Sequence, residues 1–155
     1  MLIRALPLLG VLLLPTTGSS QSVDILRNIG PIAVGVEAMR PNAERDGLPQ
    51  VMLQTAVGLR LRQRGIPVEE LKTAVENSQP ILYVVVATLK SDNKYAYCVR
   101  IQLRQRVSLS QGNLSHLYWE RTKTGMINES DLRDVMNTVL DFVDLFSNDY
   151  LWVNP

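Results

Sequence analysis

Apolar and polar residues alternate regularly in the second half of this 155-residue chain, and the alternation predicts a β-meander. Residues 81–90 form a β-branched apolar run, and residues 94–109 alternate between apolar and polar positions. Asp92 and Asn93 between them are turn formers, so the two runs are predicted to pair as one antiparallel hairpin. A third strand is predicted over about residues 117–124.

A helical period replaces this alternation on either side of the meander. Residues 49–64 begin with a proline and end before Gly65, which is typical of a helix. A closing helix is predicted over about residues 129–149, where apolar side chains fall on one stripe. The positions of the first helix that recur at helical spacing are Val51, Met52, Thr55, Leu59 and Arg62, and its apolar face is expected to be widened by Ala56 and Val57. The shorter predicted elements are a strand at 31–38, a loop at 39–47, an edge strand or turn at 66–68, and helical turns at 69–77.

The predicted element order is β-α-β-β-β-β-α. This order is typical of an α+β two-layer sandwich with a mainly antiparallel sheet and two main helices on one face. In the register set by a two-residue turn, Val86 lies opposite Val99 and Val84 lies opposite Ile101. These apolar pairs are expected to form the face of the sheet that the helices cover.

The same register gives the second face of the sheet a mixed character. Three interpretations of this face are open: a solvated surface with arginine stems over aliphatic side chains, a protein-partner or homodimer interface, or a site for a carboxylate or phosphate. Glu120 on the next predicted strand can pair with an arginine, which weakens the third interpretation. The candidate interface residues are Tyr83, Val85, Arg100, Gln102, Arg104 and Arg106.

The first twenty residues have the pattern of a secretory signal. The segment carries one positive charge at Arg4, continues with an apolar run over residues 5–14, and ends in small or turn-forming residues. The apolar run is too short to cross a membrane as a helix, which takes about 20 residues. We therefore expect a signal peptide at 1–20, a single α+β domain at 21–155, and an exported periplasmic or extracellular protein without a membrane span.

Composition and charge narrow the classes of partner and cofactor. The formal charge is +1, and without Arg4 it becomes zero, so nucleic acid is not an expected partner. The single Cys98 and single His116 exclude an internal disulfide and a zinc site built from several such ligands. Cys98 also lies far from the expected cleavage point, so no lipid anchor is predicted there.

Catalytic motifs are missing from the sequence. It contains no phosphate-binding glycine loop, nucleotide fingerprint or metal-ligand motif. His116 is expected in a loop, and the acidic stripe of the closing helix, with Asp141 and Asp144, is expected to be solvated. We predict a non-enzymatic binding or accessory module with no catalytic residue, metal or cofactor. The alternative is a small-ligand or anion-binding protein, or a carboxylate-based enzyme, that uses the arginine-bearing face.

The last ten residues, 146–155, are unusually rich in large apolar side chains. An apolar segment of this kind is not expected to stay free in solution, so we predict that it folds back along the sheet or the core. The alternative is a docking peptide for a partner, anchored by Tyr150 and Trp152, because exposed Tyr and Trp side chains are common interface anchors.

Three sequence motifs of this chain are shared with other proteins: L-R-x-x-G-I at residues 61–66, L-Y-V at 82–84, and F-x-N-D-Y-L-x-V-N-P at 146–155. With them, the chain resembles a group of uncharacterised bacterial exported proteins with a small α+β fold. The resemblance implies export and this fold over most of the chain, but no activity and no catalytic residue. At the level of element order, the chain also looks like small periplasmic modules of envelope assembly proteins, which is weak evidence of function.

Overall fold

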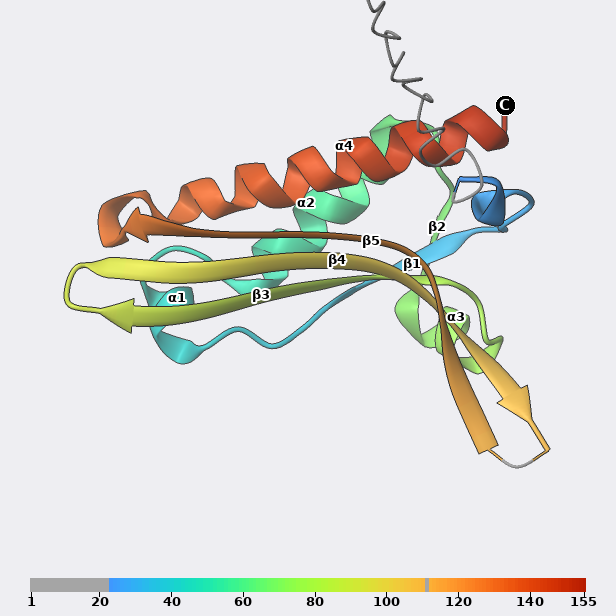
Figure 1. The fold of residues 1–155 in the computed structure, drawn as a ribbon, viewed down its shortest axis with the longest axis horizontal. Helices are drawn as coiled ribbons and strands as arrows, with labels where there is room; N and C mark the ends of the chain where they lie inside the picture. Colours follow the sequence, from blue (N-terminus) through green and yellow to red (C-terminus); the bar gives the residue numbers. More distant parts are fainter. Residues whose placement is uncertain (1–22, 111) are drawn as a thin grey trace, which may run out of the picture.

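The computed structural model describes residues 23–110 and 112–155, so the predicted signal peptide lies outside the described residues. Five strands form one sheet in the order β2-β1-β3-β4-β5 (Figure 1). The strands are β1 Ile32–Val36, β2 Val68–Glu69, β3 Ile81–Ser91, β4 Lys94–Leu109 and β5 Gly112–Asn128. The helices are α1 Pro41–Arg45, α2 Gln50–Gln63, α3 Leu71–Glu76 and α4 Val135–Val153, with short 3-10 helices η1 Asp24–Leu26 and η2 Glu129–Asp134.

The predicted α+β sandwich and the predicted hairpin register are both confirmed. β3 pairs antiparallel with β4, and Val86 lies opposite Val99 as expected from a two-residue turn at Asp92 and Asn93. β4 in turn pairs antiparallel with β5, whereas β1 pairs in parallel with β2 and with β3. The sheet is therefore mainly antiparallel, with a short parallel part at one edge.

Helices α2 and α4 cover the same side of the sheet, and α3 lies on the other side (Figure 1). The core between the sheet and the two long helices contains Leu82, Val84 and Ile101 from the sheet and Phe146 from α4, all fully buried. On the other side, α3 covers only the β1 end of the sheet, where Ala33 and Ala74 are both fully buried. Most of that side is left without a covering helix.

The predicted buried face of α2 is largely wrong. Leu53, Val57 and Leu61 are fully buried, whereas Val51 is 72% exposed and Leu59 is 52% exposed. The buried residues recur every fourth position and the two exposed ones are eight residues apart, so each set forms a stripe along the helix, and the two stripes lie on nearly opposite sides. The helix packs with the Leu53 stripe inward, and of the expected set only Val57 is buried and Ala56 partly buried.

The predicted fold-back of the C-terminal segment is also wrong, because α4 continues as a helix to Val153. Tyr150 and Val153 lie on the inner side of α4 and are 7% and 4% exposed. The Tyr150 hydroxyl donates to the Ile29 carbonyl at 3.0 Å. Asn154 then donates to the Leu26 carbonyl and accepts from the backbone N–H of Asn28, both at 2.8 Å. The segment is thus anchored, as a helix end and not as an extended plug.

The remaining differences concern element boundaries. The predicted loop at 39–47 contains α1, and the third meander strand is longer than predicted at both ends. Beyond Arg104, β4 and β5 pair with no third strand of the described residues, and they continue as a two-stranded arm that bends away from α2 and α4 (Figure 1). The arm begins at a register shift next to Leu103 and Arg104. None of the described helices is long and apolar enough to cross a membrane.

Candidate binding face

The side of the sheet that α2 and α4 leave uncovered, beyond the part under α3, is called the open face here. Because side chains alternate along each strand, every second residue of β3, β4 and β5 belongs to it. The strand register places these residues side by side in three rows. The open face comprises Tyr83, Val85, Ala87, Leu89, Ala96, Cys98, Arg100, Gln102, Arg104, Glu120, Thr122, Thr124 and Met126.

The predicted site residues nearest the arm form a hydrogen-bonded ladder around one carboxylate. Gln102 Nε2 donates to Glu120 Oε2 at 2.6 Å, and Gln102 accepts a hydrogen bond from the Arg104 guanidinium. The other carboxylate oxygen of Glu120 lies 3.9 Å from Arg100 Nε and accepts from Thr122 at 3.3 Å. Gln102 is only 5% exposed, so this ladder is a partly buried polar network in which Glu120 faces Arg100 directly and is linked to Arg104 through Gln102.

Tyr83 forms the floor beside this ladder. Its ring lies against Gly35 of β1, where an added Cβ would come within 3.1 Å of Tyr83 Cδ2. The Arg104 guanidinium carbon lies 5.7 Å from the centre of the same ring, within cation–π range. Glycine at position 35 therefore leaves room for the Tyr83 ring, and this ring in turn makes the cation–π contact with Arg104.

The structure brings together five of the six predicted interface residues. Val85 is half-buried between the ladder and the opposite end of the open face. Arg106 stands apart because it lies on the arm, where it is exposed and has no ion pair within the described part of the chain. Within the described residues, the predicted arginine stripe is therefore paired with a carboxylate only at Arg100, whereas Arg104 contacts the neutral Gln102 and Tyr83 side chains.

An apolar depression of about 590 Å³ occupies the other end of the open face. Leu89 is 64% exposed and Met126 is 74% exposed, and both border the depression with Cys98 between their strands. Sequence reasoning missed this part of the site. Leu89 falls on this face by alternation with Tyr83 and Val85, but the predicted third strand ends at about residue 124, before Met126. The further lining residues include Arg40, Ala87, Ala96 and Thr124.

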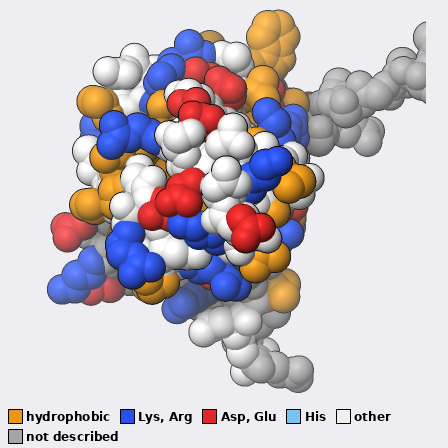
Figure 2. Space-filling view, turned by 90° about the vertical axis from the view of Figure 1, so that its left-hand side faces the viewer, with side chains coloured by type: hydrophobic (Ala, Val, Ile, Leu, Met, Phe, Trp, Pro, Cys, Tyr) orange, Lys and Arg blue, Asp and Glu red, His pale blue; other side chains and the backbone are white. Residues whose placement is uncertain are grey.

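The end of the molecule with the β3–β4 turn carries a partly exposed charged cluster. Lys90 Nζ lies 2.7 Å from Asp46 and 2.8 Å from Glu129, and the Tyr95 hydroxyl donates to Asp46 at 2.5 Å. The hydrogen bonds from Lys90 and Tyr95 hold the pKa of Asp46 below its usual 3.8, and burial raises the pKa of Tyr95. Basic and acidic side chains are interspersed across this end of the molecule (Figure 2). The cluster joins α1, the hairpin and η2, which gives it a structural role.

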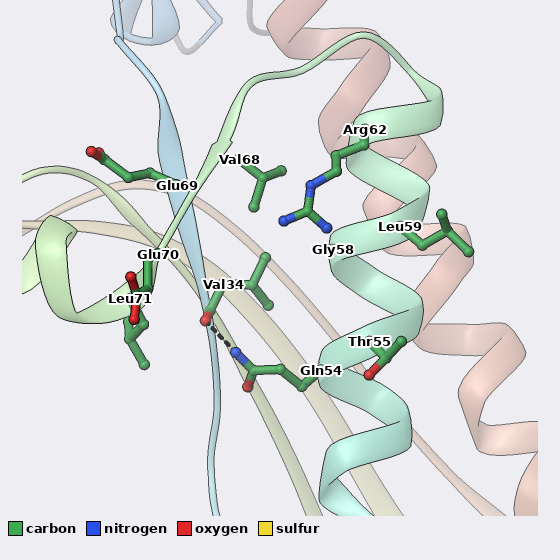
Figure 3. A pocket seen from close by; sticks show the side chains of 10 residues that line it. All are labelled: Val34, Gln54, Thr55, Gly58, Leu59, Arg62, Val68, Glu69, Glu70 and Leu71. Carbon is green, nitrogen blue, oxygen red and sulfur yellow. Dashed lines mark hydrogen bonds between the residues drawn. The ribbon is translucent and has the colours of Figure 1, made fainter.

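A second depression, of about 480 Å³, lies between α2, β2 and α3 (Figure 3). Gln54 donates across it to the Val34 carbonyl at 2.7 Å, and the Arg62 guanidinium points into it. Val68 and Leu71 supply much of its apolar wall. The depression thus separates α2 from the edge of the sheet, and the Gln54 amide bridges the gap.

Two other candidate residues, His116 and Asp144, make contacts with neighbouring side chains of the fold. His116 lies on the arm with its ring edge-on to Tyr118 at 4.6 Å. On α4, Asp144 pairs with Arg60 at 2.9 Å, so this part of the acidic stripe is not simply solvated. Within the described residues, no group of three or more His, Cys, Asp or Glu side chains is placed to hold a metal ion.

The two predicted docking residues of the C-terminal segment have opposite surroundings. Tyr150 is a core residue that packs against Phe146, so its predicted docking role does not fit its burial. Trp152, on the outer side of α4, is 82% exposed. Only Trp152 is therefore accessible to a partner.

Comparisons with known proteins give no family for this chain. No family model matches it, and no curated protein matches it. Among solved structures, a PelC dodecamer from Paraburkholderia phytofirmans is 19% identical with a TM-score of 0.46, over 76% of this chain and 87% of that one. A minor lipoprotein from Acinetobacter baumannii is 9% identical with a TM-score of 0.31, over 77% and 93% of the two chains. Lipoprotein GNA1162 from Neisseria meningitidis is 15% identical with a TM-score of 0.32, over 75% and 99%. None of these TM-scores reaches 0.5, so the likenesses identify no function.

Proposed function

We propose that this chain is a non-enzymatic binding module exported to the cell envelope, and that its open face binds a protein partner. The observation that carries the proposal is the apolar depression, whose borders hold the highly exposed Leu89 and Met126 side chains. Exposed apolar surface set beside polar groups is typical of protein-binding sites. The signal-like pattern of residues 1–20 supports export.

The charge of the open face limits the chemistry of the partner. Arg100, Arg104 and the nearby Arg106 outnumber the single carboxylate, Glu120, at the ladder end. A protein surface that presents apolar side chains to the depression and carboxylates toward the arm would complement both ends. The ladder holds its side chains in place before binding, so less side-chain entropy is lost when the partner docks.

The alternative anion site is less favoured by the same geometry. A carboxylate or phosphate bound between Arg100 and Arg104 would lie beside Glu120, which already bonds to Gln102 and faces Arg100. Repulsion between the two anions would oppose binding at that point. The arginines therefore serve better as the polar rim of a protein interface than as a small-anion pocket.

Two charge substitutions of matched chemistry test the proposal. Leu89→Asp places a carboxylate in the depression, whereas Leu145→Asp changes a comparably exposed leucine, 46% accessible, on α4. Both variants are expected to fold like the parent, because both positions are solvent-exposed. Affinity capture from the native envelope should recover a specific protein with the parent and with L145D, and recover it at least tenfold less with L89D.

The yield from L89D decides the result. Equal recovery with L89D and L145D would refute the assignment of binding to the open face. Loss of partner capture with both variants would also count against it, because L145D lies on α4 and its effect cannot be assigned to the open face of the sheet.

A further inference from the structure

The two edges of the sheet differ in how far their main-chain hydrogen-bonding groups are covered. At the β1 edge, β2 pairs with Ile32 and Ala33, and side chains from α2 cover the rest. Gln50 Nε2 donates to the Val36 carbonyl at 2.6 Å, and Gln54 Nε2 donates to the Val34 carbonyl. Because the glutamine side chains occupy these carbonyls and cover this part of the edge, the edge is protected against pairing with a foreign strand.

The β5 edge is open. Within residues 23–110 and 112–155, no strand lies beyond β5 in the sheet, and Thr122, Lys123 and Thr124 are exposed. The hydrogen bonds of the sheet fix which main-chain groups point outward. Ala33 and Glu37 of the first strand segment donate to the carbonyls of Pro80 and Val84, so even-numbered residues of β3 face β1.

Because this orientation alternates from residue to residue across the antiparallel strand pairs, it also determines which main-chain groups of β5 point toward β4 and which point to the free edge. Odd-numbered residues of β5 bond to β4, and even-numbered residues present their N–H and C=O groups to the free edge. The outward carbonyl of Glu120 accepts from the Arg121 guanidinium at 2.8 Å. Among the described residues, no side chain or strand bonds to the outward main-chain groups of Thr122, Thr124 or Met126.

We propose that this edge pairs antiparallel with β5 of a second copy of the chain, with the two-fold axis at Thr124. In this register Thr124 lies opposite Thr124 of the second copy, and Thr122 lies opposite Met126. Each of these pairs exchanges two hydrogen bonds, so six bonds use every unpaired group of the three residues in both copies. An interface of this kind uses the same surface on both subunits, as a two-fold dimer requires.

Charge and strand length select this register over its neighbours. With the axis at Thr124, Lys123 faces Gly125 of the second copy, and no two like charges lie directly opposite. An axis at Thr122 would place Lys123 opposite Arg121, which is destabilising. An axis at Met126 would leave Thr122 unpaired and bring the second copy against η2, which begins at Glu129.

The paired sheet would have ten strands and one continuous open face. Thr124 and Met126 line the apolar depression at its β5 side. The depressions of the two copies would therefore meet at the two-fold axis and present one larger binding surface. This inference concerns the edge of the sheet, and the proposed function concerns its face, so the two stand or fall separately.

The first test compares two substitutions at the same position in the purified protein. The N–H of Thr124 points to the free edge, so Thr124→Pro removes one edge donor without removing a hydrogen bond to β4. Thr124→Val keeps the N–H and the branched shape. Light scattering at micromolar concentrations should give twice the mass of one chain for the parent and for T124V, and the mass of one chain for T124P.

The second test examines the register and does not depend on the proline variant folding. T124K and T124E each place like charges opposite one another at the axis, so each should be monomeric alone. An equimolar mixture should form a dimer with one copy of each, identified by native mass spectrometry. A monomeric parent, or a mixture that stays monomeric, would overturn the inference. A dimer that survives T124P and is lost with L89D would also overturn it, because that dimer forms through the open face.

Discussion

Removal of the last turn of α4 should destabilise the fold strongly, because this segment contributes core side chains and also binds the N-terminal segment at residues 26–29. Deletion of residues 150–155 removes Tyr150 and Val153, which are almost fully buried. It also removes the hydrogen bonds that Asn154 makes with Leu26 and Asn28. The perturbation therefore acts on the helix layer and on η1 at once.

The magnitude follows from these contacts. Burial of each of the two side chains contributes about 1.5–3 kcal/mol, and each lost hydrogen bond costs about 0.5–1.5 kcal/mol. The expected loss is at least about 4 kcal/mol, against a total free energy of unfolding of about 5–15 kcal/mol for a domain of this kind. The truncated chain should be largely unfolded at low urea concentration.

The assay uses urea unfolding followed by tryptophan fluorescence. Trp119 is 6% exposed and packs edge-on against Phe146 at 5.3 Å, so its emission reports the core. Trp152→Ala removes the only other tryptophan, and since Trp152 is exposed the change should cost less than about 0.5 kcal/mol. If truncation of this W152A protein lowers the free energy of unfolding by less than about 1 kcal/mol, the packing described for Tyr150 and Val153 is refuted.

Two further predictions concern the charged cluster and the protected edge. The folded state lowers the pKa of Asp46 below 3.8, so its contribution to stability is present above that pH and is lost as the pH falls through the folded value. In the parent, Asp46 pairs with Lys90, and Asp46→Asn removes this titrating group. Urea midpoints measured from pH 6 down to about pH 3 should therefore fall less steeply for the variant than for the parent. Equal slopes for the two proteins would contradict this prediction. Gln50→Ala combined with Gln54→Ala uncovers two edge carbonyls of β1. The double variant should lose about 1–3 kcal/mol of stability and aggregate faster by turbidity, and an unchanged aggregation rate would show that the glutamines do not protect the edge.

The hairpin register could be predicted from sequence because one local feature determines it. A two-residue turn at Asp92 and Asn93 fixes every pair along β3 and β4, and the apolar residues then fall on one face. The face of α2 could not be predicted in the same way. Its two apolar stripes, one with Val51 and one with Leu53, have the same helical spacing, and only packing against the sheet distinguishes them.

The sequence at the end of α4 contains a helical spacing that predicts the continuation of the helix. Phe146, Tyr150 and Val153 follow one another at spacings of four and three residues, which is the spacing of one helix face. The large apolar side chains of residues 146–155 favoured a separate segment, so the predicted helix ends at about residue 149, whereas α4 continues to Val153. Burial of Tyr150 then follows from continuation of the same stripe.

The ladder end of the candidate site was easier to predict than the apolar end. Arg100, Gln102 and Glu120 follow from strand alternation and from the prediction that a third strand lies beside the hairpin. Met126 lies after Gly125, which breaks a strand pattern in sequence. In the fold Gly125 lies within β5 opposite Tyr97, and its missing Cβ leaves room for the Tyr97 hydroxyl, which lies only 2.6 Å from where a Cβ would be. The glycine is thus explained by a contact with the neighbouring strand, which sequence spacing does not show.

The hydrogen bonds of Asn154 also bear on the order in which the chain assembles. They join Asn154 to Leu26 and Asn28, which lie 128 and 126 residues away in sequence. The β3–β4 hairpin, by contrast, closes over two residues. Because the entropy cost of closing a loop rises with its length, and because local contacts form fastest, the meander is expected to form first and these terminal contacts last. Folding would then proceed from the middle of the chain outward, and the contacts between its two ends would be the last to close and the first to open.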